Sequence, residues 1–153
     1  MSKVSLLIID DEKDARELVK YHLSSITDVD ILGEAENGIE AIDLINSLKP
    51  DCILLDIEMP EMSGLDIVNR LNHVPQIIFI TAYNDYAVRA LEIHAVDYLL
   101  KPFDPNRLQV ALDRGKFRLS NDLIDRKELT DILKELTKKE QISHLSRIPV
   151  KNR

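Results

Sequence analysis

The stretch CILLDIEMPEMSG, residues 52–64, decides the fold. Its first four residues are all apolar, which is too short a run for a helix and lacks the polar alternation of a half-exposed strand. It therefore predicts a strand buried on both faces of a parallel sheet. Asp56 follows where this strand ends, before the turn signals Met-Pro and Ser-Gly. Because the ligand crevice of an open α/β sheet lies just past the carboxyl ends of its strands, Asp56 is a candidate site residue.

Four other short runs have the composition of strands. The run at residues 29–35 is weaker and partly polar, which suits an edge of the sheet. A stretch with helical spacing follows each strand, so that strand and helix alternate five times. This order predicts a doubly wound three-layer α/β sandwich with a parallel sheet of strand order 2-1-3-4-5. The other expected strands are Val4–Ile9, Val29–Ala35, Gln76–Ile80 and Asp97–Leu100.

Capping residues and apolar spacing predict where the helices lie. The first helix carries Ala15, Leu18, Val19 and Leu23, with His22 as a packing residue rather than a ligand. The later helices are expected after Asn37-Gly38, ending at Lys49-Pro50; after Ser63, carrying residues 65–71; after Asn84 or Asp85, carrying residues 87–94; and after Asp104-Pro105.

Length, charge and cysteine content limit the class of protein. The 153 residues suffice for one domain and a short appendage, and the net charge is −7. The acidic excess lies before Gly115 and disfavours a nucleic-acid surface there. The single cysteine, Cys52, lies in the expected central strand, so no disulfide framework exists, which suits a reducing compartment. No stretch has the length of a signal peptide's apolar region or of a membrane span, so we expect a soluble, cytoplasmic protein.

Beyond Gly115 the pattern changes. Leu129, Ile132, Leu133 and Leu136 recur at the spacing of an amphipathic helix, which either lies against its own domain or pairs with another chain. The basic residues of this end are mixed with acids, which favours a solvated helix face over a DNA-binding patch.

Five chemically capable residues fall at the carboxyl ends of the predicted strands: Asp10, Asp11, Asp56, Thr81 and Lys101. On one sheet edge they must be neighbours. Clustered carboxylates repel one another unless a cation neutralises them, and oxygen ligands without nearby histidine or cysteine select Mg²⁺. We therefore expect a Mg²⁺ site, which also attracts a phosphoryl group.

Asp56, flanked by the other acids, is the candidate nucleophile that forms an aspartyl-phosphate. The Lys101 ammonium, the Thr81 hydroxyl and the ion would neutralise the phosphoryl oxygens. Each residue taken alone also has an ordinary explanation as a solvated charge or a turn hydroxyl. The prediction depends on all of them falling at strand ends in order.

The chain resembles the receiver domains of two-component response regulators over about residues 2–118. Four motifs carry the resemblance: LLIIDDE (6–12), ILLDIEMPEMSGLD (53–66), IFITAY (78–83) and VDYLLKPF (96–103). The resemblance implies that Asp56 is the phosphoacceptor, Lys101 the phosphate contact and Thr81 the switch hydroxyl. It also implies a metal site of Asp10, Asp11, Asp56 and the Glu58 backbone carbonyl, Tyr98 as the switch aromatic, and a cis peptide between Lys101 and Pro102.

Residues 83–108 resemble in particular the receivers of the LytTR class, whose output domain binds DNA. The final RIPVKNR, residues 147–153, resembles the start of such a domain. This resemblance implies a receiver domain at 1–118, a linker helix at 119–142 and the start of a truncated output domain at 143–153. DNA binding would then belong only to the missing output domain.

The expected function is a switch, not an enzyme in the ordinary sense, that promotes its own phosphorylation and dephosphorylation. A sensor histidine kinase phosphorylates Asp56 with Mg²⁺ bound, and the change favours a homodimer. The expected dimer face is the fourth helix, fifth strand and fifth helix, including Tyr86, Val88 and Ala90.

Two alternatives come from other classes. An aspartyl phosphatase needs a second acid two residues after the nucleophile and a threonine nearby; Glu58 fits loosely and no threonine follows. A flavin carrier needs phosphate-binding amides where this chain has Asp10 and Asp11, and a stacking tryptophan that the sequence lacks.

Overall fold

A computed structural model describes residues 3–121, in which strands and helices alternate five times. The strands are β1 (Val4–Ile9), β2 (Val29–Ala35), β3 (Cys52–Leu55), β4 (Gln76–Thr81) and β5 (Asp97–Leu100). The helices are α1 (Lys13–Leu23), α2 (Gly38–Leu48), α3 (Gly64–Asn69), α4 (Ala87–Glu92) and α5 (Pro105–Ser120).

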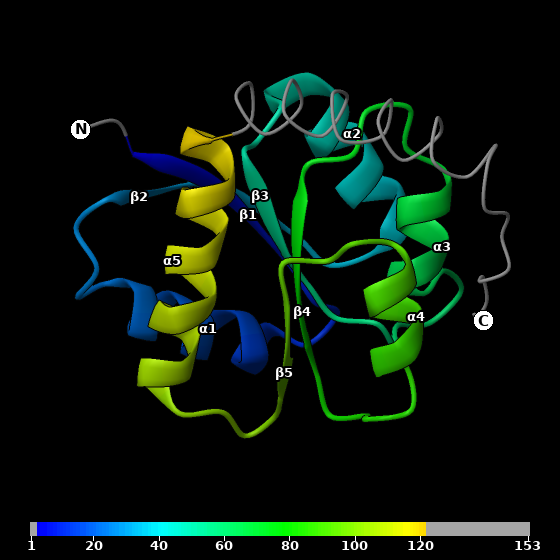
Figure 1. Ribbon diagram of the computed structural model, residues 1–153. Coiled ribbons are helices and arrows are strands. Elements are labelled where there is room, and N and C mark those ends of the chain that lie inside the picture. Colours follow the sequence, from blue (N-terminus) through cyan, green and yellow to red (C-terminus); the bar gives the residue numbers. More distant parts are fainter. Residues whose placement is uncertain (1–2, 122–153) are drawn as a thin grey trace, which may run out of the picture. The chain divides into compact units, whose positions relative to one another are not determined.

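The five strands form one parallel sheet in the order β2-β1-β3-β4-β5. Helices α1 and α5 cover one face, and α2, α3 and α4 cover the other (Figure 1). The predicted doubly wound sandwich and its strand order are therefore confirmed.

Burial explains why the apolar runs become strands. All four residues of β3 are buried, whereas exposed and half-buried residues alternate along most of β2, which lies at the edge of the sheet. The core between the sheet and helices α2, α3 and α4 includes Leu7, Ile53, Ile67 and Phe79, each no more than 1% exposed. Covering both faces of the central strands requires their near-continuous hydrophobicity.

The strand register aligns the residues that follow the strands. Ile9 pairs with Leu55, so Asp10 and Asp56, which come next, leave the sheet side by side. Thr81 pairs with Leu100, which precedes Lys101. The loops after β4 and β5 turn at the lower edge of the view in Figure 1. The sheet thus brings residues distant in sequence to one edge.

Most of the expected helix signals hold. The Asn37 side chain accepts a hydrogen bond from the Glu40 N–H, and Ser63 and Asp66 form a capping box at α3. The Asp104 carboxylate accepts from the Asn106 N–H just inside α5.

The expectations for α4 were partly wrong. Its N-cap is Tyr86, with no side-chain cap from Asn84 or Asp85. The helix ends at Glu92, and His94, expected within it, has a φ of 60°, in the left-handed region. Ala90, expected on the dimer face, is 3% exposed and belongs to the core. Its small side chain lets this short helix pack closely on the sheet.

Two smaller expectations were also wrong. Helix α3 ends at Asn69, so Leu71 lies beyond it and packs against the core from the following turn. Leu18, placed on the buried stripe of α1, is 49% exposed. His22 does pack, with its ring centroid 5.6 Å from that of Phe103.

The predicted helix around residues 129–136 and the segment 143–153 lie outside the described residues. The chain divides into compact units at Met1–Lys116 and Phe117–Arg153, and the first holds the whole sheet. Among residues 3–121, no helix combines the length and apolar character needed to cross a membrane.

Candidate metal and phosphoacceptor site

The candidate site is built on the adjacent ends of β1 and β3. The Asp56 N–H donates to the Ile9 carbonyl at 3.0 Å, and the Asp10 N–H donates to the Ala35 carbonyl at 3.1 Å. These bonds continue the ladders of the sheet by one residue. Both aspartates are therefore held by the rigid sheet rather than by a free loop.

Three carboxylates meet at this edge. Asp10, Asp11 and Asp56 each offer an oxygen, and these oxygens lie within 4.8 Å of one another. Asp10 and Asp56 are buried, at 6% and 7% exposure, whereas Asp11 is more open to solvent. Three hard oxygen donors with one open side suit Mg²⁺, which retains water ligands. The cluster is therefore able to hold a divalent cation.

The electrostatics of the cluster are those of crowded acids. Burial raises the pKa of Asp56, the Lys101 charge opposes that shift, and the negative charge of Asp10 adds to it. Burial also raises the pKa of Asp11, and Asp10 contributes further. In both cases the ionised form is disfavoured, so a bound cation would relieve a real cost.

Lys101 brings a positive charge into the cluster. Its Nζ lies 2.8 Å from Asp10 Oδ2 and 3.2 Å from Asp56 Oδ2. Burial lowers the pKa of this lysine, but the hydrogen bond that its ammonium donates to Asp10 and both nearby negative charges outweigh burial, and the net shift of the pKa is upward. The ammonium is therefore firmly charged. The predicted cis peptide between Lys101 and Pro102 is confirmed.

Thr81 and Tyr98 lie on neighbouring strands, with Thr81 at the end of β4 and Tyr98 opposite Phe79. Thr81 is fully buried, and its hydroxyl accepts a hydrogen bond from the Tyr83 N–H at 3.4 Å. The Tyr98 ring centroid lies 6.1 Å from that of Phe79, and the Tyr98 hydroxyl donates to the Tyr83 carbonyl. Both residues thus contact the start of the loop between β4 and α4, while their switch roles stay predictions.

Glu58 lies two residues past Asp56, and its side chain is exposed. The carboxylate accepts a hydrogen bond from the Tyr86 hydroxyl, which raises the pKa of that tyrosine to about 12. This contact between the loops after β3 and β4 was not foreseen, because no spacing pattern signals a pairing across two loops. The predicted metal contact of the Glu58 carbonyl stays a prediction.

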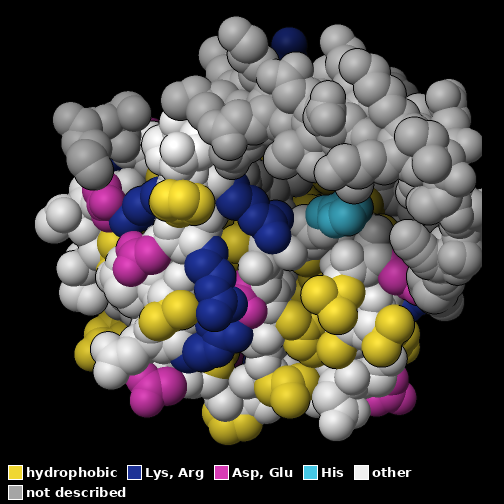
Figure 2. All heavy atoms as spheres, viewed as in Figure 1, with side chains coloured by type: hydrophobic (Ala, Val, Ile, Leu, Met, Phe, Trp, Pro, Cys, Tyr) yellow, Lys and Arg dark blue, Asp and Glu magenta, His cyan; other side chains and the backbone are white. Residues whose placement is uncertain are grey.

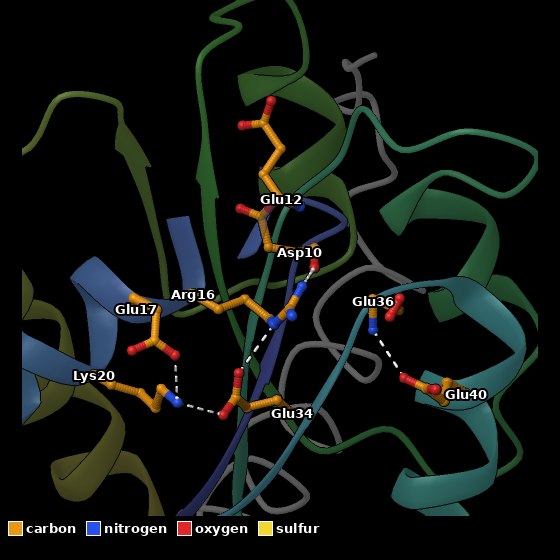
Figure 3. Close-up of polar contacts among 8 residues, drawn as sticks. All are labelled: Asp10, Glu12, Arg16, Glu17, Lys20, Glu34, Glu36 and Glu40. Atoms are coloured by element: carbon orange, nitrogen blue, oxygen red, sulfur yellow. Dashed lines mark hydrogen bonds and ion pairs between the residues drawn. The ribbon is translucent and has the colours of Figure 1, made fainter. Parts of the chain in front are cut away.

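The sequence also did not reveal a polar network beside Asp10. Arg16 and Lys20 of α1 both contact Glu34 of β2, and Arg16 in addition contacts the Asp10 backbone (Figure 3). The i, i+4 spacing of the two cations was visible in the sequence. Their common acidic partner depends on how α1 lies over the sheet.

The strand order and the acidic cluster at its carboxyl edge are typical of the receiver domains of two-component signalling. Residues 6–113 match the family model described as response regulator receiver domain. The chain belongs to this family and is a receiver domain of a two-component response regulator.

Relatives and solved structures agree with this assignment. The chain is 44% identical over 133 residues, 86% of its length, to an uncharacterised response regulatory protein of Yersinia pestis, of which the match covers 54%. It is 46% identical over 113 residues to the transcriptional regulatory protein BtsR of Escherichia coli K12, with 72% of this chain and 47% of BtsR covered. The chain thus spans about half the length of the curated relatives it matches.

Among solved structures, the receiver domain of AraT from Geobacillus stearothermophilus superimposes with a TM-score of 0.70 at 32% identity, covering 78% of this chain and 98% of that one. The response regulatory domain of mrkE from Klebsiella pneumoniae has a TM-score of 0.70 at 28% identity, covering 76% and 98%. Both match the receiver fold.

Proposed function

We propose that a sensor histidine kinase, or a small phosphodonor, transfers a phosphoryl group to Asp56 in a Mg²⁺-dependent reaction. The proposed metal ligands are Asp10, Asp11, Asp56 and the Glu58 backbone carbonyl. The observation that carries the proposal is the meeting of three carboxylates and one ammonium at one sheet edge. When bound, Mg²⁺ would supply positive charge to the phosphoryl oxygens and relieve the repulsion between the acids.

The chain's own residues perform the rest of the proposed step. An Asp56 carboxylate oxygen attacks phosphorus, and the bond from phosphorus to the donor's leaving atom breaks. Lys101 already contacts Asp56 and offers its charge to an equatorial oxygen of the phosphoryl group. Water later hydrolyses the aspartyl-phosphate, which resets the switch.

The conformational response is proposed to begin at Thr81. A phosphoryl group on Asp56 would attract the Thr81 hydroxyl away from the Tyr83 N–H, its present donor. Tyr98 would then turn toward the vacated space next to Phe79. Since its hydroxyl now holds the Tyr83 carbonyl, this rotation would release the loop before α4.

We propose the surface of α4, β5 and α5 as the dimer face. Val88 and Leu91 of α4 are 66% and 76% exposed, and Leu100 of β5 is also exposed. Figure 2 shows hydrophobic side chains gathered on the α4 side, next to a row of basic side chains toward α5. Exposed apolar surface bordered by charge is typical of a protein interface.

The output is proposed to be transcriptional and of the LytTR class. BtsR, of which the match covers 47%, is named a transcriptional regulatory protein. Under this proposal residues 1–118 form the receiver, 119–142 a linker helix and 143–153 the start of the output domain, which alone would bind DNA.

The test is phosphorylation by acetyl phosphate in the presence of Mg²⁺, followed by intact-protein mass measurement. The wild-type chain should gain one phosphoryl group, and Asp56→Asn should gain none. Chelation of Mg²⁺ should abolish labelling of the wild type. Equal labelling of both proteins would exclude Asp56 as the acceptor, and sustained turnover of a phosphomonoester would favour the phosphatase alternative.

A further inference from the structure

Arg16 contacts two different elements at once. Its Nε donates to Glu34 Oε1 at 2.9 Å, and its Nη1 donates to the backbone carbonyl of Asp10 at 2.8 Å. The side chain is only 13% exposed. Figure 3 shows the guanidinium between β2 and the end of β1, where Asp10 begins the candidate metal site.

Glu34 does not depend on Arg16 for an ion pair. Lys20, one turn further along α1, lies with its Nζ 2.6 Å from the other oxygen, Glu34 Oε2, and also contacts Glu17 at 2.8 Å. The contact to Asp10 distinguishes Arg16 from Lys20. A guanidinium can hold the carboxylate and the carbonyl together through separate nitrogens, whereas an ammonium is a single point of charge.

With the hydrogen bond from Arg16, every polar group of Asp10 has a partner. The Asp10 N–H donates to Ala35, its Oδ1 accepts from the Glu12 N–H at 2.9 Å, and its Oδ2 accepts from Lys101 at 2.8 Å. The carbonyl, bonded to Arg16, is the remaining polar group. Because the Asp10 carbonyl belongs to the peptide that leads into Asp11, holding it orients both predicted metal ligands.

The positive charge of Arg16 disfavours a cation at the neighbouring metal site, and Glu34 offsets this repulsion. The positive charge of Arg16 alone would repel a divalent ion bound at Asp10. Glu34 lies against that charge, and Lys20 and Arg16 together keep the pKa of Glu34 below its ordinary value despite partial burial. The acid is therefore ionised at neutral pH and neutralises part of the charge next to the site.

We propose that Arg16 is a positioning residue for Mg²⁺ binding, which holds the Asp10 backbone, and that Glu34 makes its charge compatible with the ion. This proposal rests on the proposed function, in which Asp10 and Asp11 bind Mg²⁺. It differs from a simple stabilising role, because the affinity for Mg²⁺ itself should depend on the geometry of the guanidinium.

The decisive variant is Arg16→Lys, which keeps the charge and removes the two-armed contact. Lys20→Arg is the matched control: it changes the other basic partner of Glu34 on the same helix, and Lys20 does not contact Asp10 in the structure. The Kd for Mg²⁺ is measured by calorimetric titration, and the metal-free Tm is measured separately. Arg16→Lys should raise the Kd about tenfold, the scale typical of losing a partner that orients a metal ligand, and Lys20→Arg should leave it within about twofold.

A lower metal-free Tm for Arg16→Lys with an unchanged Kd would overturn the proposal and leave Arg16 a purely structural role. Absence of Mg²⁺ binding in the wild type would instead overturn the metal site and the proposed function with it. Should Arg16→Lys not fold, Glu34→Gln provides a second test, since it keeps an acceptor for Arg16 and removes the neutralising charge. Its Kd should rise severalfold at low salt and approach the wild-type value at high salt, and an unchanged Kd at low salt would overturn the role of Glu34.

Discussion

Asp11 carries its charge at a cost to the metal-free fold. Its pKa is raised by burial and by Asp10, so the folded state disfavours the ionised form that predominates at neutral pH. Asp11→Asn should therefore stabilise the metal-free protein at pH 7. Because the side chain is largely solvated, we expect only about 0.5 kcal/mol.

The pH dependence of this gain checks its cause. A raised carboxyl pKa means that the penalty exists above the folded pKa and disappears once the pH falls below the ordinary value of 3.8, where the group is protonated in both states. Thermal unfolding of both metal-free proteins at neutral pH and below pH 3.8 measures this penalty, and unfolding at neutral pH with and without Mg²⁺ tests Asp11 as a metal ligand. Mg²⁺ should raise the Tm of the wild type and should raise the Tm of Asp11→Asn much less. An equal rise in Tm for both proteins would exclude Asp11 as a metal ligand.

Gly64 permits the close approach of α3 to the backbone just after β3. A Cβ at this position would lie 2.3 Å from the Asp56 backbone oxygen, closer than a Cβ approaches any such atom without a shift of the backbone. Gly64→Ala should therefore lower the free energy of unfolding by about 3 kcal/mol, the scale of forced overpacking. In the control Gly33→Ala, the new Cβ would meet Leu7 at an ordinary 3.5 Å and should change little. Urea unfolding of both variants decides, and equal effects would contradict this steric explanation.

At the scale of single residues, the acids of the site were predictable, and their supporting contacts were not. Asp10 and Asp56 follow apolar runs, and parallel strands carry their ends to one edge whatever the details of packing. The partnership of Arg16 with Asp10 depends instead on how α1 crosses the sheet and on one side-chain rotamer. Neither leaves a mark in the spacing of residues along the chain.

At the scale of elements, Asp97 joins β5 to α5. Its carboxylate, 7% exposed, accepts two hydrogen bonds from Arg107 and one from Arg114. Burial alone would raise the pKa of Asp97, but the hydrogen bonds from Arg107 and the Tyr98 N–H and the arginine charges outweigh it, so the net shift is downward. Asp97→Asn should destabilise the fold by about 2 kcal/mol at pH 7, as expected for lost hydrogen bonds to a charged group.

The sign of this effect with pH is opposite to that for Asp11. A lowered carboxyl pKa stabilises the fold above the ordinary value of 3.8, and this stabilisation is lost as the pH falls through the folded pKa. The difference between wild type and Asp97→Asn should thus be constant near neutral pH and shrink below pH 3.8. Denaturant unfolding across this range measures it, and a difference that persists in acid would exclude the ion pair as its source.

Some helix ends could be predicted from the local sequence, and others could not. The caps at Asn37 and Ser63 were predictable, because a side-chain oxygen three residues before the partner N–H is a local feature. Helix α4 has no such cap, and its end at Glu92 followed by a left-handed His94 depends on packing against the sheet. Its inward Ala90 was mistaken for surface because six residues are too few to define an apolar face.

At the scale of the whole molecule, the exposed apolar side chains lie on both faces of the sheet, and only some of them belong to the proposed dimer face. Leu91 and Val88 are exposed on α4, which contacts β5, whereas Leu18 is exposed on α1, which covers the opposite face of the sheet (Figure 1). If phosphorylation favours the proposed dimer, replacing Leu91 by a charge should prevent dimerisation without disturbing the fold, since this side chain is 76% exposed.

Beryllofluoride with Mg²⁺ mimics the phosphoryl group, and light scattering gives the solution mass. The wild type should shift toward twice its monomer mass, Leu91→Glu should remain monomeric, and Leu18→Glu should behave as the wild type. Because the proposed acceptor is Asp56 and α4 takes no part in the proposed reaction, Leu91→Glu should still gain one phosphoryl group from acetyl phosphate, which separates phosphorylation from dimerisation. Dimerisation of Leu91→Glu, or its loss only in Leu18→Glu, would move the interface away from α4 and β5.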